Sequence, residues 1–107
     1  MKRHVFHPDA DHEYAEAAFY DQGISAELGG RFFDEIESLI ADIRKDPLRF
    51  RMFDPPFRRR LSQVFPYAVV YLDQPDRVWV VAVMHLKRRP GYWKERVRWD
   101  AVESGPD

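Results

Sequence analysis

Cysteine is absent from the 107-residue sequence. Disulfide frameworks, thiolate nucleophiles and zinc sites with cysteine ligands are therefore excluded. Long apolar runs are absent as well, because the longest uninterrupted one, Val78–Met84, is far too short to cross a bilayer. The N-terminal Met1–His4 is not followed by the apolar segment that a secretory signal needs. These absences predict a cytoplasmic protein that does not enter a membrane.

A large net charge is missing too, since 17 Lys and Arg residues face 18 Asp and Glu residues, for a formal charge of −1. The two signs are nevertheless separated along the chain. Residues 1–48 contain five basic and eleven acidic side chains, a balance of −6, whereas residues 49–98 contain twelve and four, a balance of +8. The separation predicts one surface that attracts anions and another that repels them. The alternative is a pair of solvated acidic helices beside an arginine-rich strand region.

The first half of the chain predicts a hairpin of two antiparallel helices. Pro8 suits the first position of a helix, and Gly23 suits the end of one. Ser25 is a suitable N-cap for the second helix, with Ile24 placed to pack against the first turn of that helix. Pro47 ends the second helix. The apolar side chains of this helix share one stripe, made of Leu28, Phe32, Ile36, Leu39, Ile40 and Ile43.

Two glycines, Gly29 and Gly30, lie inside the second helix, where glycine is unfavourable. They do not form a phosphate-binding loop, since no strand leads into them and no Lys-Ser/Thr pair follows. Their position predicts that the first helix approaches the second closely there.

After Pro47 the spacing changes to that of strands. Strands are expected at Phe57–Gln63, Tyr67–Leu72 and Val78–Met84, and residues 73–76 have the composition of a turn. Segment 4–7 is a short, strand-like lead-in. These strands predict an antiparallel meander.

The expected fold class is therefore α+β, with the N-terminal antiparallel helix hairpin packed on one face of a small antiparallel β-sheet. Residues 1–99 form a single domain in this interpretation, and residues 100–107 form a frayed tail. The opposite face of the sheet is expected to be open or covered by a partner. Because side chains alternate along a strand, Arg58 and Arg60 share a face, and we expect them to point to that open side.

The strongest candidate for chemistry is a group of basic and aromatic residues. Guanidinium groups bind phosphates, aromatic rings stack on bases, and an imidazole titrates near neutral pH. The group consists of Arg58, Arg59, Arg60, His85, Lys87, Arg88, Arg89, Tyr92 and Trp93. If these residues converge, His85 or Tyr92, with Arg88 or Arg89, could support RNA cleavage by attack of a 2′-OH. The alternative is that the arginines pair with the acidic helices while Tyr92 and Trp93 cap the core.

A metal site is not expected. The residues near the N-terminus that could bind a metal do not follow the sequence spacing of any established metal site. These residues are His4, His7, His12, Asp9, Asp11 and Glu16. No cofactor is predicted.

Two segments carry a resemblance to a known family. The predicted helix hairpin is followed by RRRLSQVFPYAVVY (Arg58–Tyr71) and VWVVAVMHLKRRPGYW (Val78–Trp93). In this order, over roughly residues 3–96, the chain resembles the RelE/ParE superfamily of toxins, which are often described as plasmid stabilisation proteins. The resemblance implies a cytoplasmic, growth-inhibiting toxin of a type II toxin–antitoxin system. It also implies a cognate antitoxin whose disordered segment folds over the toxin.

The superfamily divides by target. RelE-like members are metal-independent endoribonucleases that cleave mRNA on the ribosome, and the resemblance would make His85, Arg88 and Tyr92 catalytic. ParE-like members instead inhibit DNA gyrase. The strand that usually carries an arginine in the ribonuclease branch has Ala68 here, and a net charge of −1 is low for a protein that enters the ribosome. Both observations favour the ParE-like branch, although a non-toxic domain that binds a partner is a third possibility.

Under the ParE-like interpretation, the basic and aromatic residues bind the target or the antitoxin. Those residues are Arg58, Arg59, Arg60, Lys87, Arg88, Arg89 and Trp93. An antitoxin would be expected to place an amphipathic helix or strand in an apolar groove. Its acidic side chains would pair with Arg58 and Arg60, and the exposed edge of the hairpin would contribute.

Overall fold

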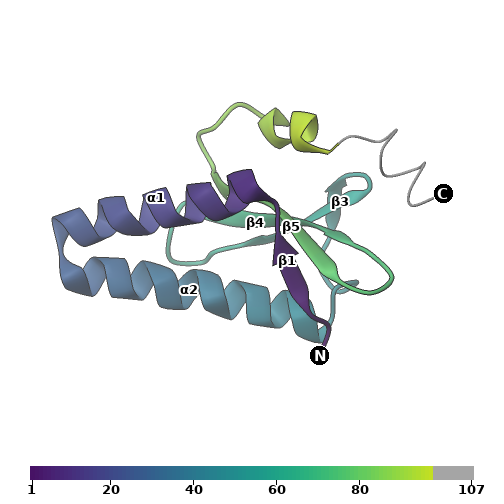
Figure 1. Cartoon of the computed structure of the whole chain (residues 1–107), viewed down its shortest axis with the longest axis horizontal. Coiled ribbons are helices and arrows are strands. Elements are labelled where there is room, and N and C mark those ends of the chain that lie inside the picture. The colour runs from purple at the N-terminus through teal and green to yellow at the C-terminus, as the bar shows by residue number, and fades with distance from the viewer. Residues whose placement is uncertain (98–107) are drawn as a thin grey trace.

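The computed structural model describes residues 1–97, and it has an α+β architecture in which two helices pack on a five-stranded sheet (Figure 1). The elements in chain order are β1 (His4–Phe6), α1 (Pro8–Ile24), α2 (Ala26–Lys45), β2 (Met52–Asp54), β3 (Phe57–Leu61), β4 (Tyr67–Asp73), β5 (Val78–His85) and the 3₁₀-helix η1 (Tyr92–Arg96). The predicted end of the domain at residue 99 and the predicted tail lie outside the described residues. Within residues 1–97, neither helix is long and apolar enough to span a bilayer.

The helix hairpin begins at Pro8 and turns at Ser25 as the sequence predicts, but Gly23 does not end the first helix, because α1 continues to Ile24 and the extended backbone of Ser25 ends it. Pro8 opens α1, and the Ser25 hydroxyl caps α2 by accepting a hydrogen bond from the Leu28 amide at 2.9 Å. Ile24 does not pack against α2 as expected, because its side chain is 61% exposed. A residue before the N-cap packs against the fourth residue of the helix, and in α2 that residue is Gly29, which has no side chain.

The close approach predicted at Gly29 is confirmed. A Cβ atom at Gly29 would lie 2.8 Å from the Cα of Gln22, whereas one at Gly30 would meet nothing within 4 Å. Gly29 is therefore required by the seam between the two helices, and Gly30 is not.

The sheet is mixed, with the strand order β1-β5-β4-β3-β2. The meander β2–β5 is antiparallel, but β1 pairs with β5 in parallel, with His4 beside Val78 and Phe6 beside Val80. The prediction of a wholly antiparallel sheet is therefore wrong at this edge. The chain leaves β1 through the helix hairpin, and such a crossover permits a parallel neighbour. Strand β2, next to Pro55 and Pro56, was not expected either.

Both faces of the sheet are covered by the chain itself. On one face, the apolar stripe of α2 packs on β4 and β5, and of its six predicted members only Leu28 is not fully buried. On the other face, Tyr92, Trp93 and Val97 pack over residues of β3, β4 and β5. The face expected to be open or partner-covered thus holds a second core beneath η1.

Arg58 and Arg60 lie on the helix side of the sheet, so their predicted placement on the opposite face is wrong. Arg60 Nη2 is 3.3 Å from a carboxylate oxygen of Asp42 in α2. Arg58 Nη1 donates a hydrogen bond of 2.8 Å to the carbonyl of Phe50. Alternation shows which side chains share a face, but the face that the helices cover is decided by packing.

Candidate functional site

Glu13 is the centre of a cluster that joins α1, β5 and η1. Its side chain is 14% exposed. One carboxylate oxygen, Oε1, accepts hydrogen bonds from the Val83 amide at 3.1 Å and from Arg96 Nη1 at 2.8 Å. The other, Oε2, accepts from the Tyr92 hydroxyl at 2.5 Å and from Arg96 Nη2 at 2.7 Å. Arg96 therefore binds the carboxylate with both ends of its guanidinium fork.

The position of Glu13 follows from the shortness of β1. Strand β1 pairs with β5 only as far as Val80, so the next residues of β5 have no strand beside them on that edge. The Val83 amide turns to Glu13 instead, and the Val81 carbonyl accepts a hydrogen bond of 3.1 Å from Arg96 Nη1. Two charged side chains thus satisfy backbone groups that the edge would otherwise leave open.

The cluster keeps Tyr92 protonated. Burial raises the pKa of the Tyr92 hydroxyl, and its hydrogen bond to Glu13 raises that pKa further. The Arg88 guanidinium lies 3.9 Å from the centre of the Tyr92 ring, and its Nη1 is 3.8 Å from Glu13 Oε2. A phenol held in this way donates a hydrogen bond to the carboxylate, keeps its own proton at neutral pH and is not available as a general base.

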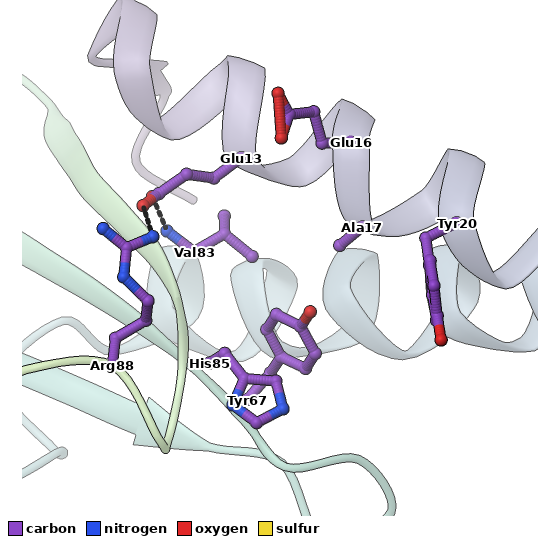
Figure 2. A pocket seen from close by; sticks show the side chains of 8 residues that line it. All are labelled: Glu13, Glu16, Ala17, Tyr20, Tyr67, Val83, His85 and Arg88. Atoms are coloured by element: carbon purple, nitrogen blue, oxygen red, sulfur yellow. Dashed lines mark hydrogen bonds and ion pairs between the residues drawn. The ribbon is translucent and has the colours of Figure 1, made fainter.

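A hollow of about 230 Å³ opens beside the cluster, between α1 and the uncovered part of β5 (Figure 2). Its lining residues are Glu13, Glu16, Ala17, Tyr20, Tyr67, Val83, His85 and Arg88. The rings of His85 and Tyr67 meet edge to face at 5.0 Å, and His85 Nδ1 accepts a hydrogen bond of 3.0 Å from the Lys87 amide. Burial raises the pKa of Tyr67, and the nearby carboxylates of Asp21 and Glu13 raise it further. The α1 side of the hollow is therefore acidic.

The predicted basic and aromatic group does not form one surface. His85 and Arg88 share the hollow beside Glu13, and Arg88, Arg89 and Tyr92 line a second hollow beside η1. Lys87 is exposed on the same turn.

The other members of the group lie elsewhere. Arg58 and Arg60 are on the helix side, and the Arg59 guanidinium lies 4.5 Å from the ring centre of Phe53 in β2. Trp93 is 1% exposed and packs against Phe53 in the second core. Trp93 is thus a core residue in this structure, and a partner could not contact its ring without displacing η1.

Sequence reasoning missed the two residues that organise the cluster, Glu13 and Arg96. An acidic residue such as Glu13 near the start of a helix already has a local explanation, because negative charge suits the helix dipole there. A signal was nevertheless present. Glu13 stands three residues after Ala10 and four before Ala17, so it shares a helix face with buried alanines. Nothing comparable marks Arg96.

Within the part of the chain that the structure describes, no three His, Asp or Glu side chains gather as metal ligands. His7 caps α1 by accepting a hydrogen bond from the Asp9 amide, and His12 pairs with Glu16. No protein-family model and no curated protein matches this sequence.

Proposed function

We propose that the protein is the toxin of a type II toxin–antitoxin system and that it acts as ParE-like toxins do, by binding and inhibiting DNA gyrase. The resemblance of Arg58–Tyr71 and Val78–Trp93 to the RelE/ParE superfamily motivates the proposal. An arrangement in which the helix hairpin precedes the meander and packs on its sheet is compatible with it. A cognate antitoxin is part of the same proposal.

The observation that carries the choice of branch is the engagement of Tyr92 and Arg96 with Glu13. RNA cleavage by a 2′-OH needs a free proton acceptor and cations directed at the developing phosphorane charge. Here the Tyr92 hydroxyl and the Arg96 guanidinium are both directed at a carboxylate. That carboxylate offsets the positive charge of the arginines and would repel a phosphate.

Ala68 supports the same choice. It is fully buried in β4 and belongs to the core beneath η1. The position at which the ribonuclease branch usually carries an arginine is therefore an apolar packing position in this chain.

A RelE-like ribonuclease is the second candidate, because one observation favours it. His85 and Arg88 line the same hollow as Glu13 and Glu16, which places an imidazole and a guanidinium beside carboxylates. In this alternative His85 would transfer a proton and Arg88 would stabilise charge on the phosphate.

Three measurements separate the candidates. Expression of the protein alone should arrest bacterial growth, and normal growth would instead favour a non-toxic binding domain. Purified protein at micromolar concentration should inhibit supercoiling by gyrase, and full gyrase activity would contradict the ParE-like proposal. Primer extension on translated mRNA should reveal no new ends. Codon-spaced cuts that disappear in His85→Ala or Arg88→Ala would establish the ribonuclease instead.

A further inference from the structure

Four hydrogen-bond donors converge on the Glu13 carboxylate, two on each of its oxygens. Oε1 accepts from the Val83 amide and from Arg96 Nη1, and Oε2 accepts from the Tyr92 hydroxyl and from Arg96 Nη2. The three residues that supply these donors, Val83, Tyr92 and Arg96, are here called the carboxylate seat. They belong to β5 and η1, whereas Glu13 reaches the seat from α1 (Figure 2). The chain thus fills the seat with a carboxylate carried by a neighbouring helix.

Each donor of the carboxylate seat has a second anchor that does not involve Glu13. The Val83 amide belongs to β5, whose other edge is paired with β4. Arg96 Nη1 also donates a hydrogen bond of 3.1 Å to the Val81 carbonyl, and Tyr92 is buried in the second core. The Arg96 guanidinium lies 5.0 Å from the centre of the Tyr92 ring. We therefore expect the donors to keep their arrangement when the carboxylate is absent, and such preorganisation favours binding.

The carboxylate seat can be approached from two sides. The hollow of about 230 Å³ lies on the α1 side, and its lining includes Glu13 and Val83 (Figure 2). The second hollow, of about 520 Å³, lies beside η1, and its lining includes Tyr92 and Arg96. Arg88 lines both hollows, so they adjoin at the seat. A small ion can therefore reach the donors from solvent.

The charges in contact with the Glu13 carboxylate are positive. Arg96 binds it, and Arg88 Nη1 lies 3.8 Å from Glu13 Oε2. Asp9 Oδ2 lies 3.7 Å from Arg96 Nε, and Asp9 is itself 63% exposed. Within residues 1–97, the other acidic residues that line the two hollows form no ion pair with these arginines, and they are Glu16 and Glu95. Without Glu13, two guanidinium groups would thus be left with one exposed carboxylate as their partner.

We propose that the carboxylate seat is a binding site for carboxylate ions and that Glu13 keeps it closed as an internal ligand. The observed ligand shows the chemical class directly, because Arg96 binds both oxygens of the Glu13 carboxylate at once. A phosphate suits the seat less well, since four donors match two oxygens and its further oxygens would find no donor there. The inference does not depend on the proposed toxin activity, because binding of a carboxylate is measured without any target.

The test removes the internal ligand and supplies a carboxylate separately. Glu13→Ala deletes one methylene and the carboxylate, which together have the size of acetate. Acetate should raise the melting temperature of this variant, with half of the effect on the order of 10–100 mM. It should also shift the ¹⁵N resonances of the Val83 amide and of the Arg96 side chain. The wild-type protein should show neither response, because the tethered Glu13 outcompetes a free ion.

Four controls assign the response to the carboxylate seat. Acetamide, which has the shape of acetate without its charge, and sodium chloride at equal ionic strength should have no effect. Inorganic phosphate should bind at least tenfold more weakly than acetate. Arg96→Met combined with Glu13→Ala should abolish the response. Gly29→Ala is the matched control for lost stability, because it leaves the seat intact, and acetate should not raise its melting temperature.

A Glu13→Ala variant that does not respond to acetate would overturn the proposal. So would an equal response to acetamide or phosphate, a response that survives Arg96→Met, or an equal response of the wild-type protein. If Glu13→Ala does not fold in chloride, refolding in acetate provides the same measurement. Acetate should then restore the native circular dichroism spectrum while acetamide does not, and failure of acetate to restore it would also contradict the proposal.

Discussion

The two helices of the hairpin use their apolar residues differently. In α2 they form one stripe, which is buried against the sheet. In α1 only Ala10, Tyr14 and Ala17 are buried, while the larger Phe19 and Tyr20 are exposed. The comparison teaches that α2 is held by its apolar stripe, whereas α1 is held near its start by Glu13 and near its end by the close contact of Gln22 with Gly29. A helix whose large apolar side chains share one face buries them in the core, whereas α1 buries mainly small side chains and leaves two aromatic rings in solvent.

The largest effect is expected from a phenylalanine on α2. Phe32 is fully buried and contacts the rings of Tyr14, Phe65 and Tyr67. Phe32→Ala should lower the free energy of unfolding by about 4 kcal/mol, through lost burial and the cavity that remains. Urea denaturation followed by circular dichroism measures the change. The same substitution on α1, Phe19→Ala, should cost less than about 0.5 kcal/mol, and equal losses would contradict the comparison.

The next effect concerns the attachment of α1. Glu13→Gln should lower the free energy of unfolding by about 2–3 kcal/mol, because the half-buried Arg96 loses the carboxylate that neutralises it. Glu16→Gln, one turn away on the exposed surface, should change it by less than about 0.5 kcal/mol. A double-mutant cycle with Arg96→Met isolates the pair. A coupling energy near zero would show that α1 is not anchored through Glu13.

The seam between the helices distinguishes two adjacent glycines. Gly29→Ala places a methyl group 2.8 Å from the backbone of Gln22 and should destabilise the protein by about 1–3 kcal/mol. Gly30→Ala meets open space and should stabilise it by up to about 1 kcal/mol through higher helix propensity. Thermal unfolding of the two variants compares them directly. Similar melting temperatures would mean that the helices are not in close contact.

The smallest effect at neutral pH is expected at the end of α2. The Tyr71 hydroxyl donates a hydrogen bond to the Pro47 carbonyl, and burial raises the pKa of Tyr71 to about 12. A raised pKa means that the folded state holds its proton more tightly than the unfolded state, so stability is lost as pH rises from about 10 toward 12. Tyr71→Phe should cost about 1 kcal/mol at pH 7 and should reduce the slope of stability against pH in that alkaline range. An unchanged slope would contradict the assignment.

Much of the fold was predictable because it depends on local periodicity. The stripe of α2, the cap at Ser25 and the strands around residues 67–72 and 78–84 all follow from spacing and from turn residues. The parallel pairing of β1 was not predictable, because three residues carry no useful period. The face on which Arg58 and Arg60 lie was predicted wrongly. The alternation of side chains along a strand shows that the two residues share a face, but it does not show which face of the sheet the helices cover.

The candidate site was predictable only in its parts. His85 and Arg88 line the same hollow, and this could be predicted because they are only three residues apart in the sequence. The Glu13–Arg96 pair joins residues 83 positions apart, and no local pattern reports such a contact. Trp93 was predicted to bind a partner, but it lies in the second core. Its residue type could not decide between the two, because aromatic rings are common both in binding surfaces and in cores.

The sequence by itself determined the class of the fold, the two helices and their turn, and the separation of acidic from basic residues, since each depends on residues near one another in the chain. Only the tertiary structure decided which charges are neutralised and which remain available. Arg60 and Arg96 are paired with carboxylates of the helices, whereas Glu16, Asp21 and Glu27 form no ion pair with a Lys or Arg of residues 1–97. The physical reason is that charge pairing requires a few ångströms of distance in space, and the fold sets that distance independently of position along the chain.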